Sequence, residues 1–189
     1  MAVPHVGNNL LEELDLFSKN LLDRLSDSKD NDLIIRPLSV KDYNKGFIQL
    51  LGQLTEVGNI SHEQFLNTFR KMKMAGDYYI VVVEDMNTGK VIGSSTLVVE
   101  QKFIHNCALR GKLEDVVVSN EYRGRQLGKL LVNTISKLAR NLRCYKLSLD
   151  CRDNLIPFYE SLGFKRELGN ANHLNARFHY ENPTEQSHL

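Results

Sequence analysis

The sequence predicts a mixed α/β domain in which helices flank a central sheet. Segments rich in β-branched and aromatic residues, which favour strands, alternate with segments whose apolar residues recur every three or four positions, which favour helices. The 189 residues are enough to build one good hydrophobic core. The expected order of elements is β-α-α-β-β-β-α-β-α-β-β, without internal repeats or low-complexity tracts.

The N-terminal part predicts an amphipathic helix over residues 10–25, because leucines recur there at helical spacing between acidic residues. The acidic face argues against docking on a membrane. A polar run over 26–32 predicts a linker. We therefore expect three segments: a helix and linker over 1–32, the folded domain over 33–180, and a polar C-terminal tail over 181–189.

The first half of the domain combines two helices with the start of the sheet. A strand over 33–36 is stopped by Pro37, and a helix with apolar residues over 47–54 follows. Ser61 can cap the next helix, which ends near Gly76. The sheet then continues with strands over 78–84 and 91–100, a hairpin loop over 85–89 between them, and a strand over 112–118.

The second half of the domain begins with an amphipathic helix over 127–142, whose apolar residues have core spacing. A strand over 145–150 follows it. Pro157 opens a short helix, since proline is accepted in the first helical turn. Gly163 then turns the chain into a last hairpin, which ends in a strand over 174–180.

Composition and charge exclude several classes of protein. The net charge of +1, the pI of about 7.7 and the mean hydropathy of −0.32 give no electrostatic footprint for nucleic acid, and no apolar run could span a membrane. The N-terminus does not resemble a secretory signal. The three cysteines follow no metal-binding spacing and indicate a reduced, cytoplasmic protein.

The last three residues, Ser187-His188-Leu189, resemble a peroxisomal targeting signal. A peroxisomal location is therefore a weaker alternative to the cytoplasm.

The stretch 113–131 indicates an anion-binding site. An apolar strand there ends in a basic loop that contains glycine and turns directly into a helix. The free backbone N–H groups of a helix N-terminus bind anions, and a phosphate or pyrophosphate is the natural guest for the surrounding positive side chains. The alternative is a strand-to-helix turn with a solvated basic rim.

This order of elements resembles the GNAT acetyltransferase superfamily. The basic loop RGRQLGK and the later pattern N-x-x-x-F-Y-x-x-x-G-F carry the resemblance. Six segments, namely LGQLTEVG, DYYIVVVED, EQKFIHNC, LEDVVVS, RGRQLGKLL and CYKLSLDC, are similar to the eukaryotic glucosamine-6-phosphate N-acetyltransferases within it. Together they cover roughly residues 33–178. The resemblance implies a mixed, mostly antiparallel sheet that splays between its fourth and fifth strands.

The activity implied is acetyl transfer from acetyl-CoA to the 2-amino group of D-glucosamine 6-phosphate, by direct attack in a ternary complex. The reaction would serve UDP-N-acetylglucosamine biosynthesis, in a homodimer and without a metal. Two alternatives remain open: a GNAT enzyme that acetylates a protein amine, and a non-catalytic module that binds acyl-CoA.

The resemblance also assigns residues to the cofactor. They are Val116, Val117, Val118, Arg123, Gly124, Arg125, Gln126, Leu127, Gly128, Lys129, Asp150, Tyr159, Glu160 and Ser161. The three valines also suit a buried strand. Gln126 stands where this family often has a second glycine. A positive φ there would cost some strain, whereas an ordinary helical first turn would let Gln126 point outward, so we expect tolerance of the glutamine and not lost binding.

Four residues are assigned to catalysis, namely Glu114, Asp115, Asp150 and Tyr159. Side chains alternate along a strand, so only one of Glu114 and Asp115 can face the sugar amine, and the other can hold sugar hydroxyls or a neighbouring chain. Tyr159 would protonate or stabilise the departing thiolate, and Asp150 would lie near the amine. The alternatives are acids on the surface and aromatic residues in the core.

The sugar phosphate needs at least two charge-assisted donors. The residues assigned to the substrate are Thr55, Lys102, Phe103, Ile104, His105, Glu114, Asp115, Val116, Tyr145, Lys146 and Arg177. Arg177 lies on the last strand, which in this family crosses to a partner subunit and completes its site. Cys151 is expected either to form a mixed disulfide with CoA or to be a small buried residue.

Overall fold

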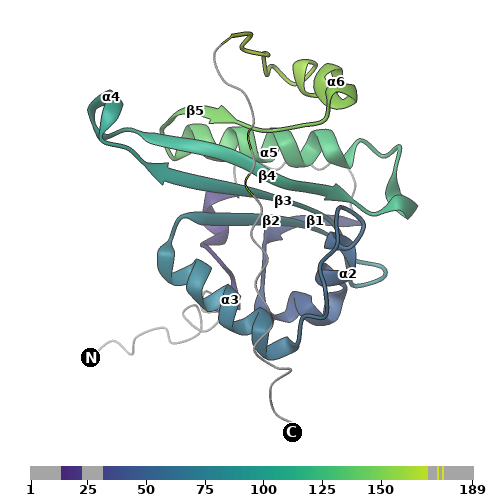
Figure 1. Ribbon diagram of the computed structural model, residues 1–189. Helices are drawn as coiled ribbons and strands as arrows, with labels where there is room; N and C mark the ends of the chain where they lie inside the picture. Colours follow the sequence, from purple (N-terminus) through teal and green to yellow (C-terminus); the bar gives the residue numbers. More distant parts are fainter. Residues whose placement is uncertain (1–13, 23–31, 170–173, 175, 177–189) are drawn as a thin grey trace, which may run out of the picture. The chain divides into compact units, whose positions relative to one another are not determined.

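The computed structural model describes residues 14–22, 32–169, 174 and 176, and its arrangement is shown in Figure 1. The chain divides into two compact units, Met1–Cys151 and Arg152–Leu189, which we describe separately. The predicted bounds at residues 33 and 180 stay predictions. Within the described ranges, no helix is long and apolar enough to cross a membrane.

The first unit contains a five-stranded sheet in the order β1-β2-β3-β4-β5. Its strands are β1 Leu33–Pro37, β2 Tyr78–Asp85, β3 Lys90–Gln101, β4 Leu109–Val118 and β5 Cys144–Ser148. The neighbours from β1 to β4 pair antiparallel, and β4 pairs with β5 in parallel. The predicted fold class, a mixed and mostly antiparallel sheet with flanking helices, is confirmed. Most of the strand predicted over 174–180 lies outside the described residues.

Helices cover both faces of this sheet. The helical elements of the first unit are η1 Lys19–Leu21, η2 Val40–Lys45, α2 Phe47–Leu51, α3 His62–Ala75, α4 Ile104–Cys107, η3 Asn120–Tyr122 and α5 Leu127–Asn141. Figure 1 shows α5 on one side of the sheet and α2 and α3 on the other. The two faces of the sheet are therefore covered by helices, and a ligand can reach the sheet only at the edges or ends of its strands.

Local sequence signals explain where the helices on the α2 and α3 side begin and end. Ser61 and Gln64 form a reciprocal capping box at the start of α3, and Gly76, with φ +73°, ends it as predicted. The helix predicted around 47–54 is shorter and is preceded by a separate 3-10 turn. Gly46 divides the two, because its φ of +86° lies in the left-handed region that glycine adopts readily.

The core has one layer on each side of the sheet. On the side of α2 and α3, Phe47, Phe65 and Phe69 pack with Ile80 and Val82 of β2. On the side of α5, the fully buried side chains are Leu131, Val132, Ile135 and Leu138. A side chain at Gly93 of β3 would meet Leu131 at 3.2 Å, so helix and sheet approach closely there. The two layers fix the position of β4 between α5 and α2.

The continuous helix predicted over 10–25 is wrong from Asp15 to Leu22, where only the short 3-10 turn η1 Lys19–Leu21 is helical. Asp15 forms an isolated β-bridge with Ser39, and the Leu16 N–H donates to the Leu38 carbonyl at 2.8 Å. Leu16 and Leu22 are buried at 4% and 3% exposure. Pairing with the backbone after β1 therefore places Leu16 in the core cluster with Leu38, and not on one face of a long helix. The remainder of the predicted helix, 10–13 and 23–25, lies outside the described residues.

Candidate functional site

The gap between β4 and β5 is the central feature of the site. The two strands pair from Leu109 and Cys144 to Lys112 and Ser148, and there the pairing stops. β4 continues for six residues to Val118. The splay predicted between the fourth and fifth strands is therefore present. The backbone N–H and C=O groups of 113–118 on this edge can pair with an extended ligand, as in strand addition.

A β-bulge interrupts β4 beside this gap. Glu114 pairs with Thr96 and Val117 with Ser94, so Asp115 and Val116 lie together opposite Ser95. Asp115 has a φ of +51°, a left-handed conformation that the short side chain of aspartate tolerates. Bulges of this kind redirect backbone groups next to active sites.

The bulge changes which residues of β4 share a face. Simple alternation would place Glu114 and Val117 on opposite faces, yet their partners Thr96 and Ser94 lie on one face. Glu114 and Asp115 lie opposite Thr96 and Ser95, which are neighbours on β3, so these two acids still alternate as expected, and the bulge alters the relation of Glu114 to Val117 instead. The sequence pattern contained no signal for the bulge, because the stretch of acids and valines suits a regular strand equally well.

Charged groups gather where the gap begins. The Lys112 Nζ lies 2.6 Å from a Glu114 carboxylate oxygen and 3.1 Å from an Asp150 oxygen. Hydrogen bonding to Glu114 is the largest influence on the pKa of Lys112, which is raised. Asp115 is an exposed residue overall, but partial burial of its carboxylate raises its pKa, and the charge of Glu114 adds to this. Three of the four residues predicted to be catalytic thus belong to one charged neighbourhood.

The basic loop joins β4 to α5 as predicted and leaves the helix N-terminus open. The Leu130 N–H donates to the Gln126 carbonyl, so the N–H groups of Leu127, Gly128 and Lys129 precede the first bond of the helix. No side chain caps this end, and its first turn contains no acid. Backbone donors and the helix dipole therefore favour an anion at this position.

Two residues of this loop have left-handed backbones. Gly124 has a φ of +85° and Gln126 a φ of +59°. Gln126 is the residue before α5, and of the two conformations considered for it the structure has the left-handed one, which costs some strain. At Gly124 a β-carbon would meet no atom within 4 Å, so the backbone conformation, and not space, favours glycine there.

Contacts outside the predicted site hold this loop in place. The Tyr122 hydroxyl donates to the carboxylate of Asp85, and the Asn120 N–H donates to the Gln53 side-chain oxygen at 2.9 Å. The Arg125 guanidinium lies 5.7 Å from the centre of the Tyr122 ring, within cation–π range. The two hydrogen bonds were not predicted, because their partners are distant in sequence.

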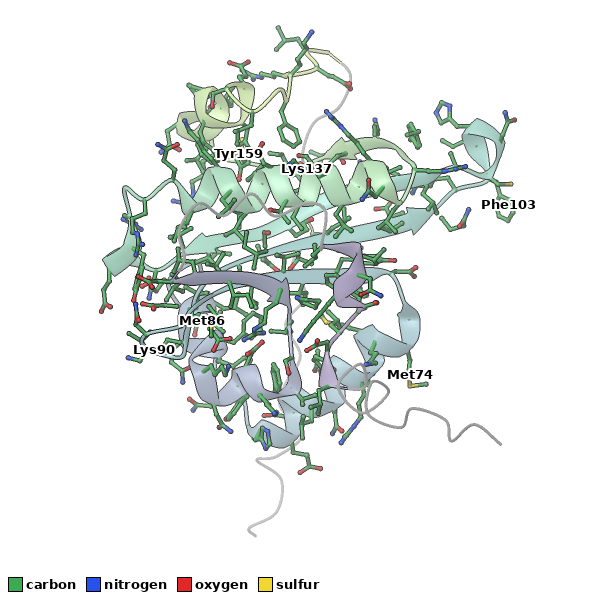
Figure 2. The ribbon with its side chains drawn as sticks, turned by 180° about the vertical axis from the view of Figure 1, so that it is seen from behind. Met74, Met86, Lys90, Phe103, Lys137 and Tyr159 are labelled. Atoms are coloured by element: carbon green, nitrogen blue, oxygen red, sulfur yellow. The ribbon has the colours of Figure 1, made fainter. Side chains whose placement is uncertain are left out.

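Several residues assigned to the substrate lie around the tip of the β3–β4 hairpin. Phe103 is 96% exposed, and Figure 2 shows it at the outer end of this hairpin. The rings of His105 and Tyr145 are 4.5 Å apart, and Lys102 forms an ion pair with Glu100. Ile104 is also exposed. The structure therefore brings the predicted substrate residues His105 and Tyr145 together, whereas Lys102 is paired with Glu100.

The remaining substrate residues are more scattered. Thr55 lies in the turn after α2, where its N–H donates to the Leu51 carbonyl. Lys146 is an exposed residue of β5. Arg177 lies outside the described residues. Cys151 is exposed, so the expectation of a small buried residue is wrong.

The second unit carries Tyr159 on a short helix. Its described elements are η4 Asp153–Leu155 and α6 Ile156–Glu160, with Pro157 in the first turn as predicted. The Tyr159 ring packs edge-on against Phe158 at 5.0 Å and Phe164 at 5.9 Å between centres. Glu160 is exposed, and the Ser161 hydroxyl donates to the Phe158 carbonyl.

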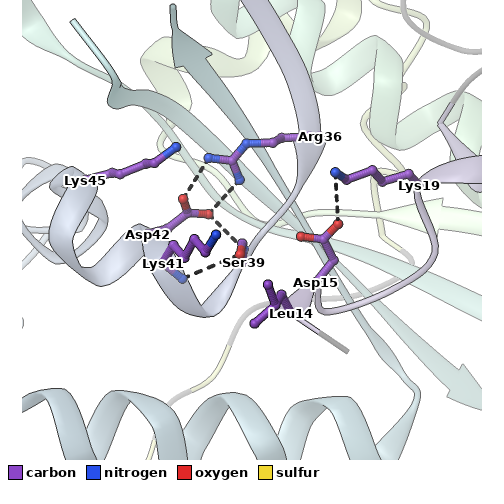
Figure 3. Close-up of a pocket in the computed structure, with 8 residues that line it drawn as sticks. All are labelled: Leu14, Asp15, Lys19, Arg36, Ser39, Lys41, Asp42 and Lys45. Carbon is purple, nitrogen blue, oxygen red and sulfur yellow. Dashed lines mark hydrogen bonds and ion pairs between the residues drawn. The ribbon is translucent and has the colours of Figure 1, made fainter. Parts of the chain in front are cut away.

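A cavity of about 130 Å³ lies elsewhere, over a buried ion-pair network (Figure 3). Arg36 donates to both carboxylate oxygens of Asp42 at 2.7 Å and to Glu84, which also accepts from Lys45. Burial alone would raise the pKa of Glu84, but the bonds from Lys45 and Arg36 lower it. Arg36 already uses its donors on these acids, so we interpret the network as structural.

The family follows from similarity over most of the chain. Residues 47–164, more than half of the sequence, match the family model described as Acetyltransferase (GNAT) family. The chain belongs to the GNAT acetyltransferase family. The matched segment contains the gap between β4 and β5, the basic loop and α6, so the geometry described above lies within the family region.

Individual relatives within the GNAT family agree with the resemblance seen in the six sequence segments. A probable glucosamine 6-phosphate N-acetyltransferase of Drosophila melanogaster is 57% identical over 150 residues, or 79% of this chain and 68% of the relative. The glucosamine 6-phosphate N-acetyltransferase of Arabidopsis thaliana is 39% identical over 134 residues, or 70% of this chain and 90% of the relative. The crystal structure of glucosamine-6-phosphate N-acetyltransferase from Arabidopsis thaliana has a TM-score of 0.74 at 36% identity, and covers 78% of this chain and 99% of its own. The predicted family membership is confirmed.

Proposed function

We propose that this chain transfers the acetyl group of acetyl-CoA to the 2-amino group of D-glucosamine 6-phosphate. One observation carries the proposal: the open β4 edge is followed, after the basic loop, by an uncapped helix N-terminus. A ligand with an extended amide-containing arm and a pyrophosphate is complementary to both parts. The relative with 57% identity, a probable glucosamine 6-phosphate N-acetyltransferase, supports the choice of acceptor.

The cofactor would be held by the backbone more than by side chains. The edge of Val116, Val117 and Val118 would pair with the pantetheine arm, while the N–H groups at the start of α5 receive the pyrophosphate. Arg123, Arg125 and Lys129 add positive charge around this end. Acetyl-CoA supplies an activated thioester, and the N–H of Val116, beside the bulge, is suited to donate to its carbonyl oxygen.

The acids at the gap would position and deprotonate the sugar amine. Glu114 and Asp150 share the ammonium of Lys112, which keeps both carboxylates available as acceptors. Asp115 would hold sugar hydroxyls or a neighbouring chain. Direct attack in a ternary complex requires no nucleophilic side chain, because much of the rate comes from orientation. Tyr159 would donate a proton to the departing thiolate.

The sugar phosphate would be bound around the hairpin tip and β5. His105, Tyr145 and Lys146 supply donors there, and Lys102 can contribute if it leaves Glu100. Thr55 would supply a hydroxyl, and Phe103 and Ile104 would border the pocket. We include in the proposal a cytoplasmic homodimer in which Arg177 of one chain completes the site of the other, and a product that feeds UDP-N-acetylglucosamine synthesis.

The experiment is an assay of CoA release from acetyl-CoA with glucosamine 6-phosphate and, in parallel, with unphosphorylated glucosamine. We expect turnover with the phosphorylated sugar alone. Equal turnover with both sugars would contradict the phosphate pocket while keeping an amino-sugar acetyltransferase. Turnover with neither sugar, although a peptide amine is acetylated or CoA only binds, would overturn the proposed acceptor.

A further inference from the structure

Lys112 occupies the last paired position between β4 and β5, opposite Ser148. Glu114 and Asp150 each follow that pair by two residues, Glu114 on the continuing β4 and Asp150 on the chain just beyond the end of β5, so they stand at equivalent places on the two sides. The Lys112 Nζ reaches both, at 2.6 Å from Glu114 and 3.1 Å from Asp150. One ammonium group therefore connects the two sides of the gap where it opens.

Electrostatics explains why such a connection matters here. Two carboxylates at equivalent places beyond the last strand pair repel each other, and the strand pairing, which ends at Ser148, does not fix their separation. An ammonium with three donors can bond to both and cancel the repulsion. The three side chains are between 32% and 49% exposed, so solvent screens the contacts and their contribution to folding is small. Their effect on the site is the larger consequence.

We propose that Lys112 is a positioning residue for acetyl transfer, which holds Glu114 and Asp150 as paired acceptors at the opening of the gap. The inference rests on the proposed function, because that function places the sugar amine beside these acids. It concerns the arrangement and charge of the two carboxylates and gives Lys112 no bond to the reacting atoms.

Several other charged groups lie near Lys112, and the pH dependence of the reaction has to be interpreted with them in view. Asp115 follows Glu114 in the chain, and Glu100 of β3 lies close to Lys102 and Arg110 of the same hairpin. The ion pair with Lys102 is the main influence that lowers the pKa of Glu100, and Lys112 contributes to it. The pKa of Lys112 is itself raised by hydrogen bonding to Glu114, so Lys112 stays positive at neutral pH. A change on the acidic side of a pH–rate profile would therefore report carboxylates.

The test compares Lys112→Met, which removes the charge and keeps the length, with Lys112→Arg, which keeps the charge. The unchanged enzyme and both variants are assayed with acetyl-CoA and glucosamine 6-phosphate across pH 5–9. For Lys112→Met we expect kcat to fall about ten- to a hundredfold, while the KM for acetyl-CoA changes little. We expect the acid limb of kcat/KM to move up by about half a pH unit or more, because a nearby positive charge favours the ionised carboxylate. Lys112→Arg should restore most of both properties.

Two controls make the result specific. Lys90→Met makes the same change at an exposed residue of β3 and should leave the profile unchanged (Figure 2). Asp150→Asn is then made alone and together with Lys112→Met. If Lys112 acts through Asp150, the two losses in kcat will combine to less than their product. Thermal unfolding of each variant separates these effects from loss of the fold, and Lys112→Gln replaces Lys112→Met if the latter does not fold.

The outcomes separate this inference from the function on which it rests. A folded Lys112→Met enzyme with unchanged kcat and an unchanged acid limb overturns the role of Lys112 alone. Losses in the double variant that multiply fully overturn it as well. If the unchanged, folded enzyme does not acetylate glucosamine 6-phosphate, the proposed function fails and the role of Lys112 fails with it.

Discussion

The Tyr122 hydroxyl donates a hydrogen bond to the carboxylate of Asp85, and this bond ties the loop before α5 to the end of β2. Asp85 also accepts from the Asn87 backbone at 2.8 Å, so it is fixed from both sides. The hydrogen bond from Tyr122 is the largest influence that lowers the pKa of Asp85. A residue outside the gap thus controls the position of the anion-binding loop.

Replacing Tyr122 by phenylalanine tests this control. The loop loses its anchor while the ring beside Arg125 remains, so we expect the KM for acetyl-CoA to rise by about two- to tenfold with a smaller change in kcat. The pKa of Asp85 is lower in the folded chain than in the unfolded chain. The hydrogen bond from Tyr122 therefore stabilises the fold at pH values above the unfolded pKa of Asp85, and this stabilisation is lost as the pH falls through its folded pKa. Unfolding measured from pH 7 to 3 should therefore depend less on pH in Tyr122→Phe. Unchanged kinetics and pH dependence would contradict the anchor.

Because Gln126 has a left-handed backbone, two substitutions there should change the free energy of unfolding in opposite directions. A residue with a β-carbon pays about 1–2 kcal/mol in this conformation. Gln126→Gly should therefore raise the free energy of unfolding by up to about 1 kcal/mol, since glycine's greater freedom in the unfolded chain offsets part of the gain. Gln126→Val, whose branched side chain tolerates the region poorly, should lower it by about 1–3 kcal/mol. Urea unfolding measures both, and equal stability of the two variants would contradict the strain.

Asp115 offers a test of function against stability. Partial burial raises its pKa, with a second contribution from Glu114, so the folded chain binds the proton more tightly than the unfolded chain. Stability from this residue is therefore present below the unfolded pKa and is lost as the pH rises through the folded pKa. Asp115→Asn should make the protein more stable at pH 7, and its stability should depend less on pH as the pH rises above the unfolded pKa of aspartate, while kcat/KM falls about tenfold or more. Thermal unfolding and the CoA-release assay measure the two effects, and a less stable Asp115→Asn protein would contradict this view.

The buried network around Arg36 predicts a large effect without any role in catalysis. Asp42 is fully buried, and Arg36→Met would leave its charge without the guanidinium. We expect unfolding to become about 3–5 kcal/mol easier, as when one partner of a buried ion pair is removed. Arg70→Met, at an exposed position of α3, serves as the control and should cost no more than about 0.5 kcal/mol. The kcat of folded Arg36→Met should stay near that of the unchanged enzyme.

Sequence patterns predicted the elements that depend on neighbours in the chain. Ser61 and Gly76 predicted the two ends of α3, and the run from Arg123 to Lys129 indicated an anion-binding site before α5. The bulge at Asp115 was not predicted, because it depends on the register of β4 against β3. The hydrogen bond between Tyr122 and Asp85 was not predicted either, because it joins residues 37 positions apart in the sequence. The site was therefore predictable in its residue types, whereas its supporting contacts depend on tertiary structure.

The bond from the Leu16 N–H to the Leu38 carbonyl decides where the chain can be shortened. A trimmed protein starting at Leu33, where the polar run of the sequence ends, would lose Leu16 from the core cluster beside α2 and α3. The apolar surface uncovered around Leu38 and Phe47 would then face water and favour aggregation. Trimmed forms for crystallisation or expression should therefore retain Asp15 and the residues that follow it.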